Sequence, residues 1–154
     1  MKTRTMILTI ALCLVAAAVC FASNANMGTW KLNEAKSKFA AGAGKNTTVV
    51  YEAAGDKVKV TVDGVDSDGK PTHNEWTGNF DGKFYPVTGD PASDSRSYKK
   101  INGRTLWLTI KKDGKVTSSG RITVAADGKS RTVNTSGTNS KGKKVRSIAV
   151  YDKM

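Results

Sequence analysis

Cysteine is scarce in this chain of 154 residues, and its two cysteines, Cys13 and Cys20, both lie within the first 25 residues. The rest of the chain therefore can form no disulfide of its own and offers no thiol nucleophile or thiolate metal ligand. Its fold must be stabilised by a packed core, and its length fits a single domain large enough to bury one.

Histidine is equally scarce, with His73 as the single example. The chain has no nucleophile elbow, zinc signature or glycine-rich phosphate loop, so we expect neither an enzyme nor a cofactor. His73 and Glu75 would supply only two metal ligands, so we expect a solvent-facing histidine and no metal site. The stretch 64–75 partly imitates a calcium loop, but Pro71 interrupts it, which favours a hairpin turn.

Acidic residues are about half as frequent as basic ones, with 13 against 25, and the formal net charge is +12. The lysines recur in turns instead of forming one cluster, which favours a role in solubility. The alternative is attraction to an anionic surface such as lipid headgroups or acidic polysaccharide. No nucleic-acid recognition motif is present, so we expect no nucleic-acid partner.

The first 25 residues have the layout of a secretory signal peptide. Lys2 and Arg4 precede an apolar run over 6–22, and small residues follow at 23–25. This order predicts export to the periplasm or the exterior, with cleavage after Ala25 and a single domain over 26–154. Removing the segment takes away two basic residues and leaves a net charge of +10.

Two alternatives concern the same segment. Cleavage after Ala22 is the second choice. The apolar run is short for a membrane span, so we do not expect a transmembrane protein. Lipid anchoring at Cys20 is disfavoured, because Val19 stands where such signals carry a small residue.

Turn signals divide the rest of the chain at near-regular intervals. Asp-Gly pairs occur at 63–64, 68–69, 81–82, 113–114 and 127–128, an Asn-Gly pair at 102–103 and a Lys-Gly pair at 141–142. Such pairs adopt positive φ at little cost and favour hairpins. The longest irregular stretch, 85–95, is either the mouth of a barrel or a plain connection.

Between the turns, apolar and polar residues alternate with a period of two, as in Val58, Val60 and Val62. The predicted strands are 28–33, 47–54, 57–64, 72–80, 83–88, 95–101, 104–112, 115–125, 130–138 and 143–152. The stretch 34–41 favours one short helix. Short local connections predict an all-β, antiparallel up-and-down barrel of eight to ten strands in preference to a sandwich, and closure removes exposed edges.

The motif "GTWKL" at 28–32, with the helical stretch and meander behind it, resembles the start of calycin proteins: lipocalins, fatty-acid-binding proteins and exported bacterial relatives without assigned activity. The resemblance implies a barrel in which Trp30 plugs one end. It also implies an arginine stacked on Trp30, for which Arg146 in the last strand is the available residue. The fatty-acid-binding branch ends in Arg-x-Tyr; here Tyr151 matches the tyrosine, but Ala149 replaces the arginine.

Arg96 and Tyr98 are the main candidates for ligand binding. They lie two residues apart and share one face of a strand. A buried arginine needs an anionic partner, which a ligand could supply, whereas a solvent-facing strand would bind nothing. Trp107 and Tyr151 are further candidates, with Trp107 either lining a second face of the pocket or covering the outside.

These features give two functional hypotheses. The first is an exported binding protein for a small, mainly apolar ligand. In one form of this hypothesis the ligand also carries an anionic group. The alternative is a periplasmic or extracellular interaction or inhibitor protein that uses its loops and basic surface. An apolar cavity of roughly 300 Å³ or more would favour the first, and a solidly packed barrel the second.

Overall fold

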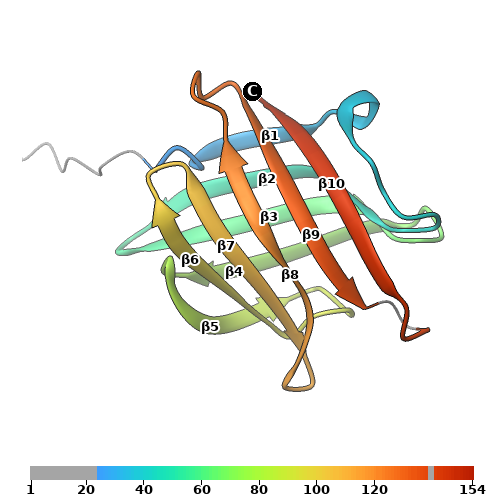
Figure 1. Cartoon of the computed structure of the whole chain (residues 1–154). Helices are drawn as coiled ribbons and strands as arrows, with labels where there is room; N and C mark the ends of the chain where they lie inside the picture. Colours follow the sequence, from blue (N-terminus) through green and yellow to red (C-terminus); the bar gives the residue numbers. More distant parts are fainter. Residues whose placement is uncertain (1–23, 139–140) are drawn as a thin grey trace, which may run out of the picture.

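The computed structural model describes residues 24–138 and 141–154, which form a closed antiparallel barrel (Figure 1). Its strands are β1 (Gly28–Leu32), β2 (Lys45–Ala54), β3 (Lys57–Val65), β4 (Pro71–Gly78), β5 (Asp81–Thr88), β6 (Ser95–Asn102), β7 (Thr105–Lys112), β8 (Lys115–Val124), β9 (Ser130–Thr138) and β10 (Lys144–Lys153). Each strand pairs with its neighbours in the chain, and β1 pairs with β10 to close the barrel. The predicted up-and-down barrel is confirmed, with all ten strands present.

The Asp-Gly pairs mark the turns, with two exceptions: Asp63-Gly64 lies inside β3, and Asp81-Gly82 lies at the start of β5. In the four pairs that continue into lysine, the glycines Gly69, Gly82, Gly114 and Gly128 have φ between 71° and 83°. These are conformations that residues with a side chain rarely adopt. Asp63-Gly64 was wrongly expected to turn: it lies inside β3, where a Cβ on Gly64 would collide with the carbonyl of Lys45.

The helix expected over 34–41 is reduced to a single 3-10 turn, η1 (Glu34–Lys36). Asn33 caps this turn by accepting a hydrogen bond from the Lys36 amide. The chain then becomes extended, because Lys38 pairs with Ile148 of β10 and the Ser37 hydroxyl accepts a hydrogen bond from the Val150 amide. Pairing along β10 therefore replaces helix formation here.

One end of the barrel is closed by large side chains, a layer that we call the floor. Its members are the inward residues with at most 1% exposure: Trp30, Val60, Trp76, Leu106 and Val124. The Trp76 ring also contacts the rings of Tyr98 and Tyr85, at centroid distances of 4.7 Å and 5.7 Å. Gly78 leaves room for this cluster, since a Cβ there would lie 2.5 Å from the Tyr85 ring.

The segment before β1 lies against the floor. Asn26 is fully buried, and its carbonyl accepts a hydrogen bond of 2.7 Å from the Trp30 indole N–H. The Asn24 side-chain oxygen accepts hydrogen bonds from the amide and the side chain of Asn26. Apart from Asn24 and Ala25, the expected signal peptide lies outside the described residues and stays a prediction.

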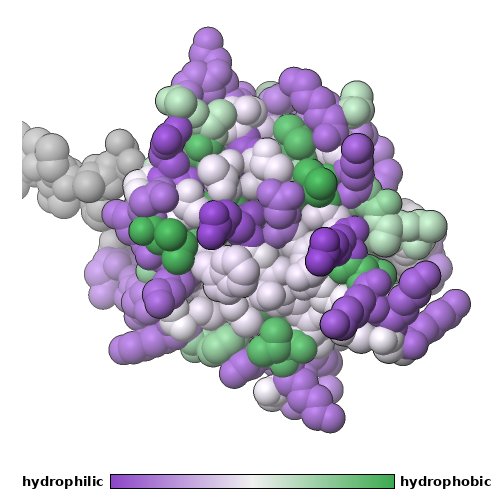
Figure 2. Space-filling view, in the orientation of Figure 1, coloured by the Kyte–Doolittle hydropathy of each residue, from purple (hydrophilic) through white to green (hydrophobic). Residues whose placement is uncertain are grey.

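The outer surface carries its charges in a dispersed pattern. Figure 2 shows hydrophilic residues spread over the face formed by β6 to β10, around paler residues of intermediate hydropathy. None of the helical residues that the structure describes forms a stretch long and apolar enough to cross a membrane.

Candidate functional site

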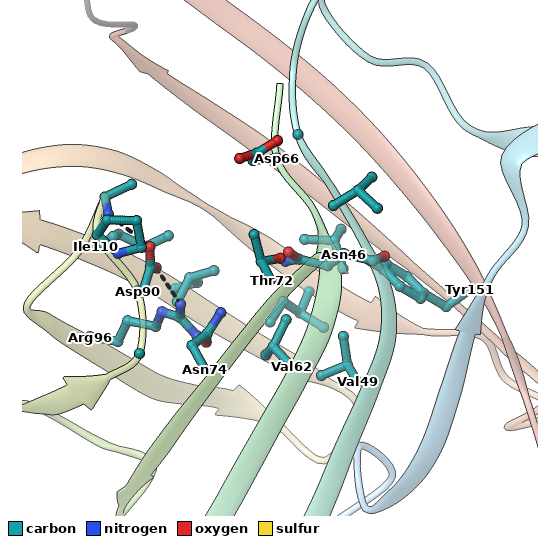
Figure 3. A pocket seen from close by; sticks show the side chains of 18 of the residues that line it. Asn46, Val49, Val62, Asp66, Thr72, Asn74, Asp90, Arg96, Ile110 and Tyr151 are labelled. Atoms are coloured by element: carbon teal, nitrogen blue, oxygen red, sulfur yellow. Dashed lines mark hydrogen bonds and ion pairs between the residues drawn. The ribbon is translucent and has the colours of Figure 1, made fainter. Parts of the chain in front are cut away.

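A cavity of about 570 Å³ lies inside the barrel above the floor (Figure 3). The floor residues do not line it. Its wall is aliphatic and is formed by Val49, Val62, Leu108, Ile110, Ile122 and Val133. Its mouth is formed by Gly44, Val65, Asp66, Ser67, Thr72, Gly89, Asp90, Pro91 and Ala92.

Along each strand, every second residue points inward, so one inward residue lies in the floor and the next one faces the cavity. In β3, Val60 belongs to the floor and Val62, two residues on, faces the cavity. In β7, Leu106 and Leu108 repeat this arrangement. The two inward indole rings, those of Trp30 and Trp76, both lie in the floor, so the smaller aliphatic side chains above it surround a volume that they do not fill.

Arg96 enters the cavity near its mouth, on the side opposite Tyr151 in Figure 3. Its guanidinium Nη2 lies 2.9 Å from the Asp90 carboxylate, in the loop between β5 and β6. The stretch 85–95 therefore contributes to the mouth through this loop. The Trp76 indole N–H donates to the Arg96 carbonyl at 3.0 Å, which holds this part of β6 against the floor.

Asp90 is held in its ionised form. Partial burial would raise its pKa, but hydrogen bonds from the Ser93 hydroxyl and the Ala92 amide, together with the Arg96 charge, hold the pKa below its ordinary value. Arg96 and Asp90 therefore compensate each other's charge. Two neighbouring buried atoms remain without a hydrogen-bond partner in the described structure: Arg96 Nε and the Asn74 side-chain oxygen.

Arg131, on β9, is the second arginine that lines the cavity, and it is only 2% exposed. Its guanidinium carbon lies 4.9 Å from the Trp30 ring centroid, 5.0 Å from that of Tyr51 and 4.8 Å from that of Tyr151. Within the described residues, no carboxylate forms an ion pair with it, and its Nε and Nη1 have no hydrogen-bond partner. Each cation–π contact contributes about 0.5–2 kcal/mol, and the several kcal/mol that burying such a charge costs is fully recovered only when an anion is also present.

Three tyrosines lie in the lining beside Arg131: Tyr51, Tyr98 and Tyr151. Burial raises the pKa of Tyr151 to about 12, and its hydroxyl donates to the Asn46 carbonyl at 3.0 Å. Burial also raises the pKa of Tyr98. Both hydroxyls therefore stay protonated at neutral pH and can donate hydrogen bonds.

Some of the site residues predicted from the sequence lie where they were expected, and others do not. Arg96, Tyr98 and Tyr151 line the cavity, and Trp30 lies in the floor. Trp107 does not line it: the residue faces outward from β7 and is 40% exposed, because Leu106 and Leu108 occupy the inward positions.

Arg146 was the wrong partner for Trp30. Ala149 and Tyr151 are the buried positions of β10, so Arg146 falls on the exposed face of that strand. Arg131 of the preceding strand stacks on Trp30 instead, and Lys153 Nζ lies 5.2 Å from the same ring. Sequence reasoning missed Arg131, although it shares a strand face with Val133, the one large aliphatic residue of β9.

His73 lies away from the cavity lining. Its Nδ1 is 2.6 Å from the Asp63 carboxylate, and its Nε2 is 3.7 Å from Glu75. The Asp66 carboxylate accepts hydrogen bonds from the amides of Asp68 and Lys70, which closes a hairpin turn over 66–70, and the rest of the stretch 64–75 belongs to β3 and β4. Over residues 24–138 and 141–154, no three His, Cys, Asp or Glu side chains gather as a metal site.

Comparison with known proteins supports the fold. A solved structure described as EF1p2_mFAP2b bound to DFHBI matches with a TM-score of 0.50 and 10% identity, covering 84% of this chain and 94% of that one. A redesigned β-barrel, mFAP1, bound to DFHBI, gives a TM-score of 0.43 and 18% identity, covering 84% and 95%. No protein-family model and no curated protein matches the chain.

The Arg96–Asp90 pair yields a prediction about stability. Asp90→Asn leaves the Arg96 charge buried without a carboxylate, so the free energy of unfolding at pH 7 falls by about 2 kcal/mol. An aspartate whose pKa is depressed in the folded state stabilises the protein above its unfolded pKa of about 3.9, and this stabilisation is lost as the pH falls through the folded pKa. The difference between variant and wild type therefore shrinks below about pH 4.

Urea unfolding of both proteins across this pH range measures the effect. Asp63→Asn is the matched control, because its ion pair with His73 is exposed and contributes no more than about 1 kcal/mol. Equal losses for the two variants at pH 7 would contradict this role of Asp90.

Proposed function

We propose that this protein is an exported binding protein for a small, mainly apolar ligand that carries an anionic group. The observation that carries the proposal is the cavity of about 570 Å³, which has an aliphatic wall, a packed floor and a mouth built from loops. Small-molecule sites in proteins commonly have this size and this mixture of apolar wall and few polar groups.

The contrast between floor and cavity supports a binding role over the interaction hypothesis. The floor demonstrates that this chain can fill a barrel cross-section with large side chains. Directly above it the packing stops, although protein interiors are normally close-packed and their buried polar groups paired. A ligand would fill the volume and supply partners for those polar atoms.

The anionic part of the proposal is supported by the charges on the lining. Two buried guanidinium groups, those of Arg96 and Arg131, face the cavity, and Asp90 forms an ion pair with only the first. Among the described residues that line the cavity, Asp66 is the other acid, and its carboxylate bonds to backbone amides of its own turn. The formal charges of these two arginines and two aspartates cancel, but the Arg131 guanidinium forms no ion pair with a carboxylate among the described residues, so an anionic ligand would pair with Arg131.

Export is proposed from the sequence, and the contacts of Asn24 bear on where processing occurs. Cleavage after Ala25 would remove the Asn24 oxygen that accepts two hydrogen bonds from Asn26. It would also place a charged amino terminus on Asn26, which is fully buried. Burial of an unpaired charge is costly, so we propose cleavage after Ala22 instead.

The intact mass of the protein recovered from the exported fraction tests this assignment. A chain that begins at Ser23 is expected. A chain that begins at Asn26 would contradict the structural argument but not export, whereas an unprocessed chain retained in the cell would contradict export.

Ligand binding in the cavity can be tested with the neutral, apolar fluorescent probe N-phenyl-1-naphthylamine. Its fluorescence should rise on binding to the wild type. Val62→Trp places an indole inside the cavity and should weaken binding about tenfold or more, because the volume is taken up. Val116→Trp, at a position that is 57% exposed, is the matched control and should bind like the wild type.

Circular dichroism establishes that both variants retain the barrel. Unchanged probe affinity in a folded Val62→Trp variant would contradict the proposed function, and so would a wild type that binds neither this probe nor an aromatic carboxylate such as 2-naphthoate.

A further inference from the structure

The two arginines in the cavity differ in their electrostatic state. Arg96 is neutralised by Asp90 at 2.9 Å, near the mouth. Arg131 lies deeper, between the floor residue Trp30 and the rings of Tyr51 and Tyr151, and is 2% exposed. Within the described part of the chain, no carboxylate forms an ion pair with Arg131.

Two of the guanidinium nitrogens of Arg131, Nε and Nη1, lack the hydrogen bonds that a purely structural role would give them. An arginine that only plugs a barrel would use its N–H groups on backbone carbonyls, as Trp30 and Trp76 use theirs. Arg131 Nε and Nη1 instead have no partner, although the side chain is buried and lines the cavity. These N–H groups can donate charge-assisted hydrogen bonds to the oxygens of an anion.

We propose that Arg131 binds the anionic group of a ring-bearing monoanion, of the aromatic carboxylate class, which enters with its charged end toward the floor. This assignment rests on the proposed function and names the chemistry of its ligand. The charged group of the ligand contacts Arg131, its ring lies beside the tyrosine rings, and any further apolar part lies against the aliphatic wall.

The surroundings of Arg131 favour a ring next to the charge. The faces and edges of Tyr51, Tyr98 and Tyr151 line this end of the cavity, and aromatic rings pack well against one another in offset or edge-to-face arrangements. Tyr98 stays protonated and can add a hydrogen bond to an anion. The aliphatic residues Val49 and Val62 lie along the wall and fit the uncharged remainder.

The charges on the lining favour a single negative charge. Because Asp90 already compensates Arg96, one positive charge remains on the buried lining, at Arg131. A dianion such as a phosphate monoester would leave one charge uncompensated in a site of low polarity, at considerable cost. A neutral ligand would leave Arg131 unpaired.

The test compares 2-naphthoate with methyl 2-naphthoate, which has the same ring but no charge, by calorimetric titration at neutral pH. Wild-type protein should bind the acid at least about tenfold more tightly than the ester. In Arg131→Met, affinity for the acid should fall about thirtyfold or more, because the charge pair is lost, while affinity for the ester changes little. Arg146→Met removes one exposed positive charge from the same barrel and should retain the preference for the acid.

A second measurement keeps the inference testable if Arg131→Met does not fold. In the ¹H–¹⁵N spectrum of the wild type, the Nε–H signal of Arg131 can be identified by its proximity to the Trp30 ring. It should shift on addition of 2-naphthoate and stay unchanged with the ester. A shift at Arg96 Nε–H alone would overturn the assignment to Arg131.

The outcomes separate this inference from the proposed function. Equal binding of acid and ester by the wild type overturns the role of Arg131 while the cavity remains a binding site. Binding of N-phenyl-1-naphthylamine without binding of either naphthoate compound overturns the ligand class alone. If none of the three compounds binds, the proposed function fails together with the inference.

Discussion

The burial of two tryptophans at one end of the barrel is the constraint on which the rest of the interior depends. Each indole N–H needs a hydrogen-bond acceptor inside the protein, and each finds a backbone carbonyl: Asn26 for Trp30 and Arg96 for Trp76. The first bond holds the N-terminal segment against the barrel end. The second holds β6 so that the Arg96 side chain faces the cavity. The tryptophans thus close the floor and also position the strand and the segment that surround it.

The same two rings connect the floor to the charges above it. The Arg131 guanidinium lies over the Trp30 ring, and the centroids of the Trp76 and Tyr98 rings are 4.7 Å apart. Each aromatic ring that contacts a guanidinium contributes about 0.5–2 kcal/mol, and burying the charge without an anion costs several kcal/mol. Arg96 avoids that cost through Asp90, whereas Arg131 does not. The cavity therefore contains one arginine that is paired with a carboxylate and one that is not. This difference is the basis for proposing that the charged end of the ligand points toward the floor.

Much of the barrel was predictable from the sequence, because its signals are local. Period-two alternation located the ten strands, and glycines at positive φ marked the hairpins after Asp68, Asp113 and Asp127. The helix expected over 34–41 ends after a single 3-10 turn, because pairing of Lys38 with Ile148 is a long-range contact that local propensity does not contain. Strand parity was the main obstacle at the site. The last strand alternates two mixed faces, so its sequence did not show that Arg146 faces outward, and Arg131 on β9 was not considered. The size of the cavity depends on how far opposite walls stand apart, which no single strand encodes.

The central claim is that the barrel is hollow above its floor and holds one small molecule there. Native mass spectrometry of the exported protein, purified without organic solvent, tests it most directly. The account predicts a folded species heavier than the chain by the mass of one small molecule, which is released when acid and solvent unfold the barrel. It would be contradicted if the folded protein had the mass of the chain alone, even after incubation with excess N-phenyl-1-naphthylamine.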